Sequence, residues 1–139
     1  MADINGKPQL YIAVGDPEEE CPECIWPLGK DPHRPTALIV KAPNDLGADA
    51  MVMLVAGGLL EAVINPFADG FYGTRKGDEV ENWTTCKGIF GSGWAIGNSG
   101  KLLIDPIREA SFNAYGVDNS MFLLPAIFDP RIGRCWTPV

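Results

Sequence analysis

Short apolar runs separated by turn residues recur along the whole chain. Gln9–Val14 is rich in aromatic and β-branched residues and ends at a Gly-Asp-Pro turn, and Thr36–Lys41 has the same character. Such runs are typical of short β-strands. Similar apolar segments over 79–87, 89–96, 101–104, 108–117 and 120–128 extend the pattern toward the C-terminus. The hydrophobic pattern therefore predicts many short strands joined by tight turns.

The apolar segment Met51–Ile64 fits two structures. Gly57-Gly58 lies between two six-residue apolar arms, which is a signal for a two-residue hairpin turn, whereas two glycines inside a helix cost about 1 kcal/mol each. The same residues form a helix if Asp45 or Asp49 caps its start and Asn65-Pro66 ends it. We expect the hairpin, and the helix is the alternative.

Composition favours the β interpretation. The chain has 139 residues, which suits a single domain spanning residues 1–139. Its 16 glycines and 12 prolines leave few segments long enough for a helix of ordinary length. We therefore expect a mainly β fold, an antiparallel sandwich or a partly open barrel of short strands, with a proline-rich N-terminal arm and room for one helix at 49–64.

The arm spans residues 16–35 and combines prolines with acidic residues. Prolines at 17, 22, 27, 32 and 35 predict that the arm contains neither a helix nor a central strand. The apolar residues Ile25, Trp26 and Leu28 directly follow an acidic run on this stiff segment. We expect these three residues, and Trp136 near the C-terminus, to contact a neighbouring protein molecule. The alternative is that the triplet folds back onto the core of its own chain.

The charge balance argues against nucleic acid as a partner. Eleven Lys and Arg stand against 18 Asp and Glu, a net charge of −7, so there is no basic surface to neutralise phosphates. The first 15 residues lack the pattern of a signal peptide. The apolar run Ala50–Ile64 contains Glu61 and is shorter than the ~20 residues of a membrane span. We expect neither a leader nor a membrane segment.

The four cysteines carry the strongest chemical signal. Cys21 and Cys24 have the CxxC spacing of a metal knuckle or a redox pair, while Cys86 and Cys135 stand alone. Zinc held by all four thiolates is the metal site that we predict, because thiolates are soft ligands. Disulfides, within or between chains, and ordinary reduced thiols are the alternatives.

No catalytic residue and no cofactor apart from this zinc are predicted. His33 is the single histidine, so two-histidine metal sites cannot form within one chain, and a histidine between prolines in a loop is expected to face solvent. The stretch Gly91–Gly97 resembles a dinucleotide fingerprint, but its last spacing is one residue too long and no helix is expected after it.

These observations predict a non-catalytic structural or assembly protein whose partners are copies of itself or another structural protein. A virion component, such as a capsid decoration or coat subunit, fits this build. One alternative is a small-molecule binding module or enzyme with a pocket lined by the aromatic loop Phe67–Tyr72 and the Gly91–Gly97 bend. The other is an interaction domain that zinc stabilises.

Overall fold

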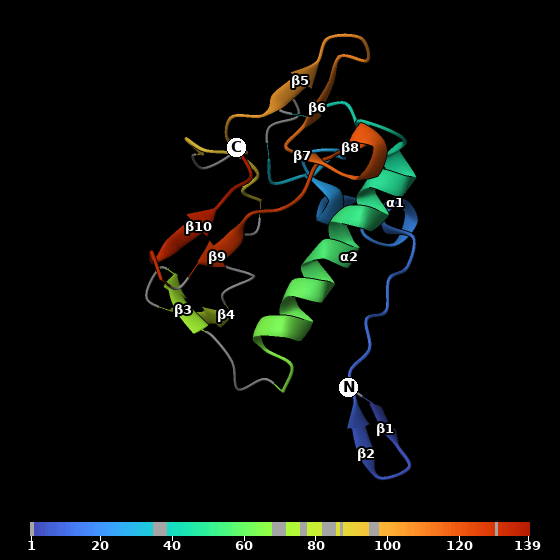
Figure 1. Cartoon of the computed structure of the whole chain (residues 1–139), viewed down its shortest axis with the longest axis vertical. Helices are drawn as coiled ribbons and strands as arrows, with labels where there is room; N and C mark the ends of the chain where they lie inside the picture. Colours follow the sequence, from blue (N-terminus) through green and yellow to red (C-terminus); the bar gives the residue numbers. More distant parts are fainter. Residues whose placement is uncertain are drawn as a thin grey trace.

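The fold combines one long helix, short helical turns and paired short strands (Figure 1). The computed structural model describes residues 2–34, 39–67, 72–75, 78–81, 86, 88–94, 98–129 and 131–139. The helical elements are α1 (Pro17–Glu20), η1 (Pro22–Ile25), α2 (Leu46–Ile64) and η3 (Val117–Asn119). The prediction that the prolines exclude a helix from the arm is therefore wrong for residues 17–25, because proline is tolerated at the first positions of a helix and begins both α1 and η1.

The described strands pair two by two, always antiparallel. The pairs are β1 (Ala2–Ile4) with β2 (Lys7–Gln9), β3 (Tyr72–Arg75) with β4 (Asp78–Glu81), β5 (Leu103–Asp105) with β6 (Ala110–Phe112), β7 (Ala114–Tyr115) with β8 (Met121–Phe122), and β9 (Ile127–Asp129) with β10 (Arg134–Trp136). In the part of the chain that the structure describes, no sheet has a third strand. The predicted sandwich or barrel is therefore wrong. Its strands are too short, and too often interrupted by Gly and Pro, to build larger sheets.

Two predicted strands illustrate the difference. β2 ends at Gln9, and residues 10–14 run on from it toward α1 (Figure 1) without pairing with any strand in the described part of the chain. Residues 39–41 are not in a strand either, and the preceding residues 36–38 of that prediction lie outside the described part. Both runs are apolar, as the sequence shows, but a run forms a strand only where a second strand pairs with it.

α2 is a helix of 19 residues, so the predicted hairpin is wrong and the alternative is correct. The Asp45 carboxylate accepts a hydrogen bond from the Ala48 backbone N–H at 3.2 Å, and the Asn65 N–H closes the last turn on the Glu61 carbonyl at 2.8 Å. Capping at both ends and a run of good helix formers outweigh the cost of the two glycines. Gly58 also has a packing role, because the side chain of Ile12 lies against it.

The start of α2 is fastened to a distant hairpin. Asp49 is buried, and its carboxylate accepts hydrogen bonds from the Asn44 backbone N–H and from the Asn44 side-chain amide, both at 2.7 Å. The same amide nitrogen donates to the Met121 carbonyl in β8 at 2.8 Å. A buried carboxylate is tolerated because it is hydrogen-bonded. This network holds the helix at a defined position against β7 and β8.

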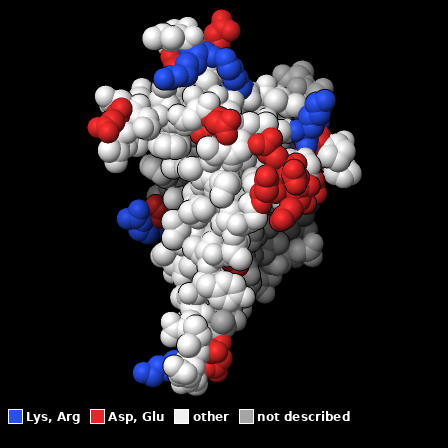
Figure 2. All heavy atoms as spheres, turned by 90° about the vertical axis from the view of Figure 1, so that its right-hand side faces the viewer, with Lys and Arg blue, Asp and Glu red and all other residues white. Residues whose placement is uncertain are grey.

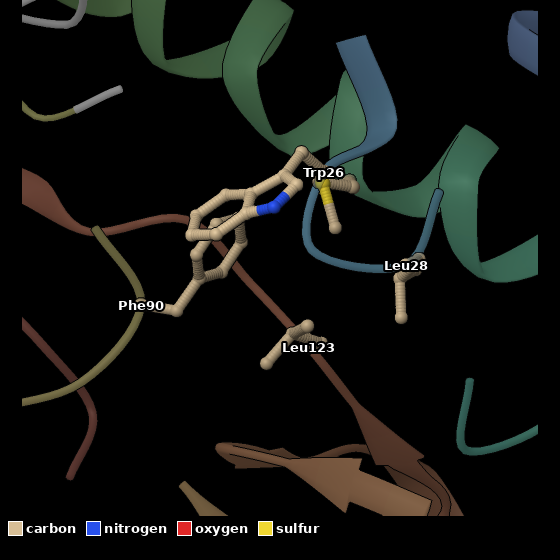
Figure 3. Close-up of a cluster of buried hydrophobic side chains, with 5 residues drawn as sticks. Trp26, Leu28, Phe90 and Leu123 are labelled. Atoms are coloured by element: carbon tan, nitrogen blue, oxygen red, sulfur yellow. The ribbon is translucent and has the colours of Figure 1, made fainter. Parts of the chain in front are cut away.

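The main core joins the arm to the rest of the chain. Trp26, Leu28, Met53, Phe90 and Leu123 pack into one buried cluster (Figure 3). Trp26 is only 4% exposed, and Ile25 is buried as well. The triplet predicted to contact a neighbour therefore folds back onto its own core, because burying these large side chains stabilises the chain itself. Trp136, in β10, remains half exposed.

Asn113 connects three further segments next to this core. Its amide nitrogen donates to the carbonyls of Phe90 at 2.8 Å and Leu124 at 2.7 Å, and its amide oxygen accepts from the Leu124 N–H at 2.8 Å. The side chain is almost fully buried. It thus satisfies backbone groups that short strands leave without ladder partners.

α2 is by length and composition able to cross a membrane. Its 18-residue window has a mean hydropathy of 1.7, and 17% of that window is buried. The sequence predicted that the apolar run from Ala50 is too short to span a membrane. That prediction fails because the helix already begins at Leu46 and has 19 residues. What matters for function is that a strongly apolar helix is largely uncovered.

Candidate ligand cleft

A cleft of about 630 Å³ lies between the extended residues 10–15, the helix α2 and the segment 23–34. Phe90, Pro125 and Ala126 close one side. This volume is within the range of small-molecule sites, and most lining side chains are apolar, as in such sites.

α2 forms the longest wall of the cleft. Met53, Leu54, Gly57, Gly58 and Glu61 line it from successive turns of one helix face. At Gly57 a β-carbon would meet nothing within 4 Å. The cleft is therefore open at this glycine, and a larger side chain there would project into free space.

Arg34 supplies the positive charge of the cleft and is held on two sides. Its guanidinium lies over the Trp26 ring, 4.4 Å from the centroid, and its Nε is 3.2 Å from the Asp31 carboxylate. Gly88 has a φ of +82°, and a β-carbon there would clash with Arg34 Nη1. Glycine at this position permits both the backbone conformation and the close approach of the guanidinium. The cation–π contact and the ion pair fix the orientation of Arg34.

Among the described residues that line the cleft, acidic groups outnumber basic ones. These residues include Glu23, Asp31 and Glu61, with Arg34 as their one cation. Since Asp31 is paired with Arg34, the two glutamates dominate the remaining charge. Such a site favours ligands that carry a cationic amine or hydroxyl donors and disfavours anions such as phosphate.

The four cysteines form two disulfides, Cys21–Cys24 and Cys86–Cys135. The predicted zinc site requires four thiolates brought together, whereas the structure pairs the sulfur atoms in two separate places. The fold brings Cys86 and Cys135 together as that prediction required, but not with Cys21 and Cys24. The disulfide alternative thus describes this structure, with Cys24 lining the cleft.

Sequence reasoning missed the cleft. The pocket predicted at Phe67–Tyr72 and Gly91–Gly97 falls largely on residues outside the described part, and His33 is exposed, as expected. The residues that line the cleft come from five separated segments with no motif spacing. A basic residue eight positions after Trp26 carries no signal by itself, because only the tertiary fold stacks Arg34 on the indole.

Comparison with known proteins assigns the chain to one family. Residues 1–138 match the family described as Phosphate-induced protein 1 conserved region. The chain is 39% identical over 136 residues to Protein EXORDIUM of Arabidopsis thaliana, covering 96% of this chain and 43% of that protein. It is 37% identical over 131 residues to Protein PHOSPHATE-INDUCED 1 of Nicotiana tabacum, covering 93% and 43% respectively. No solved structure matches.

These matches overturn the predicted function. The family is represented by plant proteins, so the prediction of a virion component or other structural assembly protein is wrong. The error has a clear origin: turn density, a proline-rich arm and the lack of a catalytic motif are properties of many unrelated proteins. The chain spans less than half the length of the curated relatives quoted above.

Proposed function

The chain belongs to the phosphate-induced protein 1 family, and we propose that it acts outside the cell and that its cleft binds a small apolar ligand bearing amine or hydroxyl donors. The proposal is one of binding without catalysis. It rests chiefly on the cleft between residues 10–15, α2 and Arg34.

Cysteine pairing supports an extracellular role. Both disulfides together use all four cysteines of the chain, and none is free. Disulfides persist in oxidising compartments and are rare in the cytosol. The Cys86–Cys135 bond lies beside a buried cluster with Ile89 and Ala126, so it belongs to the folded core. A chain that depends on such a bond is suited to a secreted protein.

The chemistry of the cleft supports the ligand class. Its volume of about 630 Å³ and apolar helix wall would remove a small apolar body from water. Glu23 and Glu61 at its lining provide acceptors for donor groups of the ligand. Arg34 is already engaged by Asp31 and Trp26, which argues against inorganic phosphate as the ligand.

The test uses N-phenyl-1-naphthylamine, a neutral apolar amine whose fluorescence rises on leaving water. We expect saturable binding by the chain. Gly57→Leu should weaken probe binding at least tenfold, because the leucine side chain fills the cleft. Gly57→Ala is the matched control, since it also removes the helix glycine, and it should bind the probe nearly as tightly as the unchanged chain. Equal affinity of the two variants would show that the probe binds elsewhere. Inorganic phosphate should not displace the probe, and displacement would contradict the ligand class.

A further inference from the structure

The first observation is an extended apolar segment without a strand partner. Leu10, Tyr11 and Ile12 are all exposed although they belong to a run of strongly β-forming residues. Residues 10–14 follow directly on β2 and make no ladder hydrogen bonds with any residue that the structure describes. An open, apolar strand-like edge of this kind is a template for pairing with another strand.

The second observation is an apolar stripe on α2 that faces away from the cleft. Met51, Val55, Leu59 and Val63 recur every four residues and are all exposed, Leu59 by 53% and Val63 by 77%. None of the four lines the cleft. Figure 2 shows a broad surface nearly free of charged side chains between the N-terminal hairpin at its lower end and the charged regions above. Exposed apolar side chains that lie together on one helix face are typical of an interaction site.

The third observation is the length of the relatives. The matched region covers 43% of Protein EXORDIUM and 43% of Protein PHOSPHATE-INDUCED 1. More than half of each relative is thus additional polypeptide. We propose that residues 10–14 and the stripe on α2 are the docking surface for this additional part of the family protein, which contributes a β-strand beside residues 10–14 and apolar side chains over the stripe.

A lipid bilayer fits these observations less well. Asp49 and Asn44 bind the start of α2 to β8, and Met53 packs in the main core, so one side of the helix is committed to protein. Glu61 lies within the span and lines the cleft. Free strand edges are also not tolerated in lipid. A strand-bearing protein segment satisfies both the open backbone of residues 10–14 and the apolar stripe.

The test compares the isolated chain with a chimera in which this chain replaces the matched region of Protein EXORDIUM. We expect backbone amides of residues 11–14 to exchange hydrogen at least tenfold more slowly in the chimera, because they gain strand partners. Leu59→Glu should lower the melting temperature of the chimera and leave that of the isolated chain nearly unchanged. Ile107→Glu is the matched control, since Ile107 is 90% exposed in the β5–β6 turn, and should affect neither.

Three results would overturn the proposal. The first is equal amide exchange in both proteins together with tolerance of Leu59→Glu in the chimera. The second is protection of residues 11–14 in the isolated chain that rises with its concentration, which would identify a second copy as the occupant. The third is binding of the isolated chain to phosphatidylcholine vesicles that Leu59→Glu abolishes. If the chimera fails to fold, exchange at the aligned residues of intact Protein EXORDIUM gives the same comparison. None of these outcomes depends on the proposed ligand.

Discussion

Ile12 lies so close to Gly58 that a β-carbon on this glycine would be 2.7 Å from Ile12 Cγ2. The glycine in the middle of α2 is therefore the point at which the extended residues 10–14 approach the helix. Its neighbour Gly57 has no such contact. Two adjacent glycines that look equivalent in the sequence thus have different roles.

The glycine pair provides a sharp test of the helix. Gly57→Ala should raise the free energy of unfolding by about 1 kcal/mol, because alanine is the better helix former and nothing blocks its methyl group. Gly58→Ala should raise the free energy of unfolding by less than Gly57→Ala does, or lower it, because the Ile12 side chain must move to make room for the methyl group. In the background of Ile12→Ala, Gly58→Ala should recover the gain. Urea unfolding measures all four variants, and a destabilising Gly57→Ala would favour the hairpin instead.

Trp26 should act on folding rather than on assembly. Trp26→Ala removes the largest side chain of the main core and should cost about 3 to 5 kcal/mol of unfolding free energy. Trp26→Phe should cost less, because an aromatic ring remains against Phe90 and Met53. Thermal unfolding and light scattering should be recorded together. If Trp26→Ala changed the oligomeric state and left the melting temperature unchanged, Trp26 would contribute to an interface between chains instead.

The two disulfides should differ in their contribution to stability. In the chain-entropy description, the Cys86–Cys135 bond, with a sequence separation of 49, contributes about 4 kcal/mol, and the Cys21–Cys24 bond, with a separation of 3, contributes about 2 kcal/mol. Double Cys→Ala variants of each pair, compared by denaturant unfolding, test this order. Titration of the unreduced protein in denaturant should find no free thiol. Four reactive thiols would restore the zinc site as a candidate.

Asp129 should keep its charge in unusually acidic solution. The Arg131 guanidinium and then the Arg131 backbone N–H donate hydrogen bonds that lower the pKa of Asp129 from 3.8 to about 2. Because the folded-state pKa is the lower one, the stabilisation is fully present above about pH 4 and is lost as the pH falls through about 2. Carboxyl NMR titration measures the pKa directly. Arg131→Ala should move it back toward its ordinary value, and no movement would show that the ion pair does not form.

Local features of the fold could be predicted from the sequence. For the helical alternative, the sequence offers Asp45 and Asp49 as N-caps and Asn65-Pro66 as the stop, and the structure uses Asp45 and Asn65. The strands of the hairpins at 103–112 and 114–122 overlap the predicted apolar segments 101–104, 108–117 and 120–128, although the pairing of these strands was not predicted. Caps and turns depend on residues within a few positions, so the sequence contains the physical information that they require.

The tertiary structure decided what lies far apart in the chain. Caps and helix-forming residues favour the helix at 46–64, but its position in the fold, with Gly58 against Ile12 and Met53 in the main core, depended on residues distant in the chain. Three further features also depend on the folded chain. They are the pairing of Cys86 with Cys135, the stacking of Arg34 on Trp26, and the burial of Ile25 and its neighbours. These are all long-range choices, in which several apolar or sulfur-bearing partners are chemically equivalent and only packing geometry selects one. The sequence by itself determined which segments are apolar and where the chain turns, because those properties reside in single residues and their immediate neighbours.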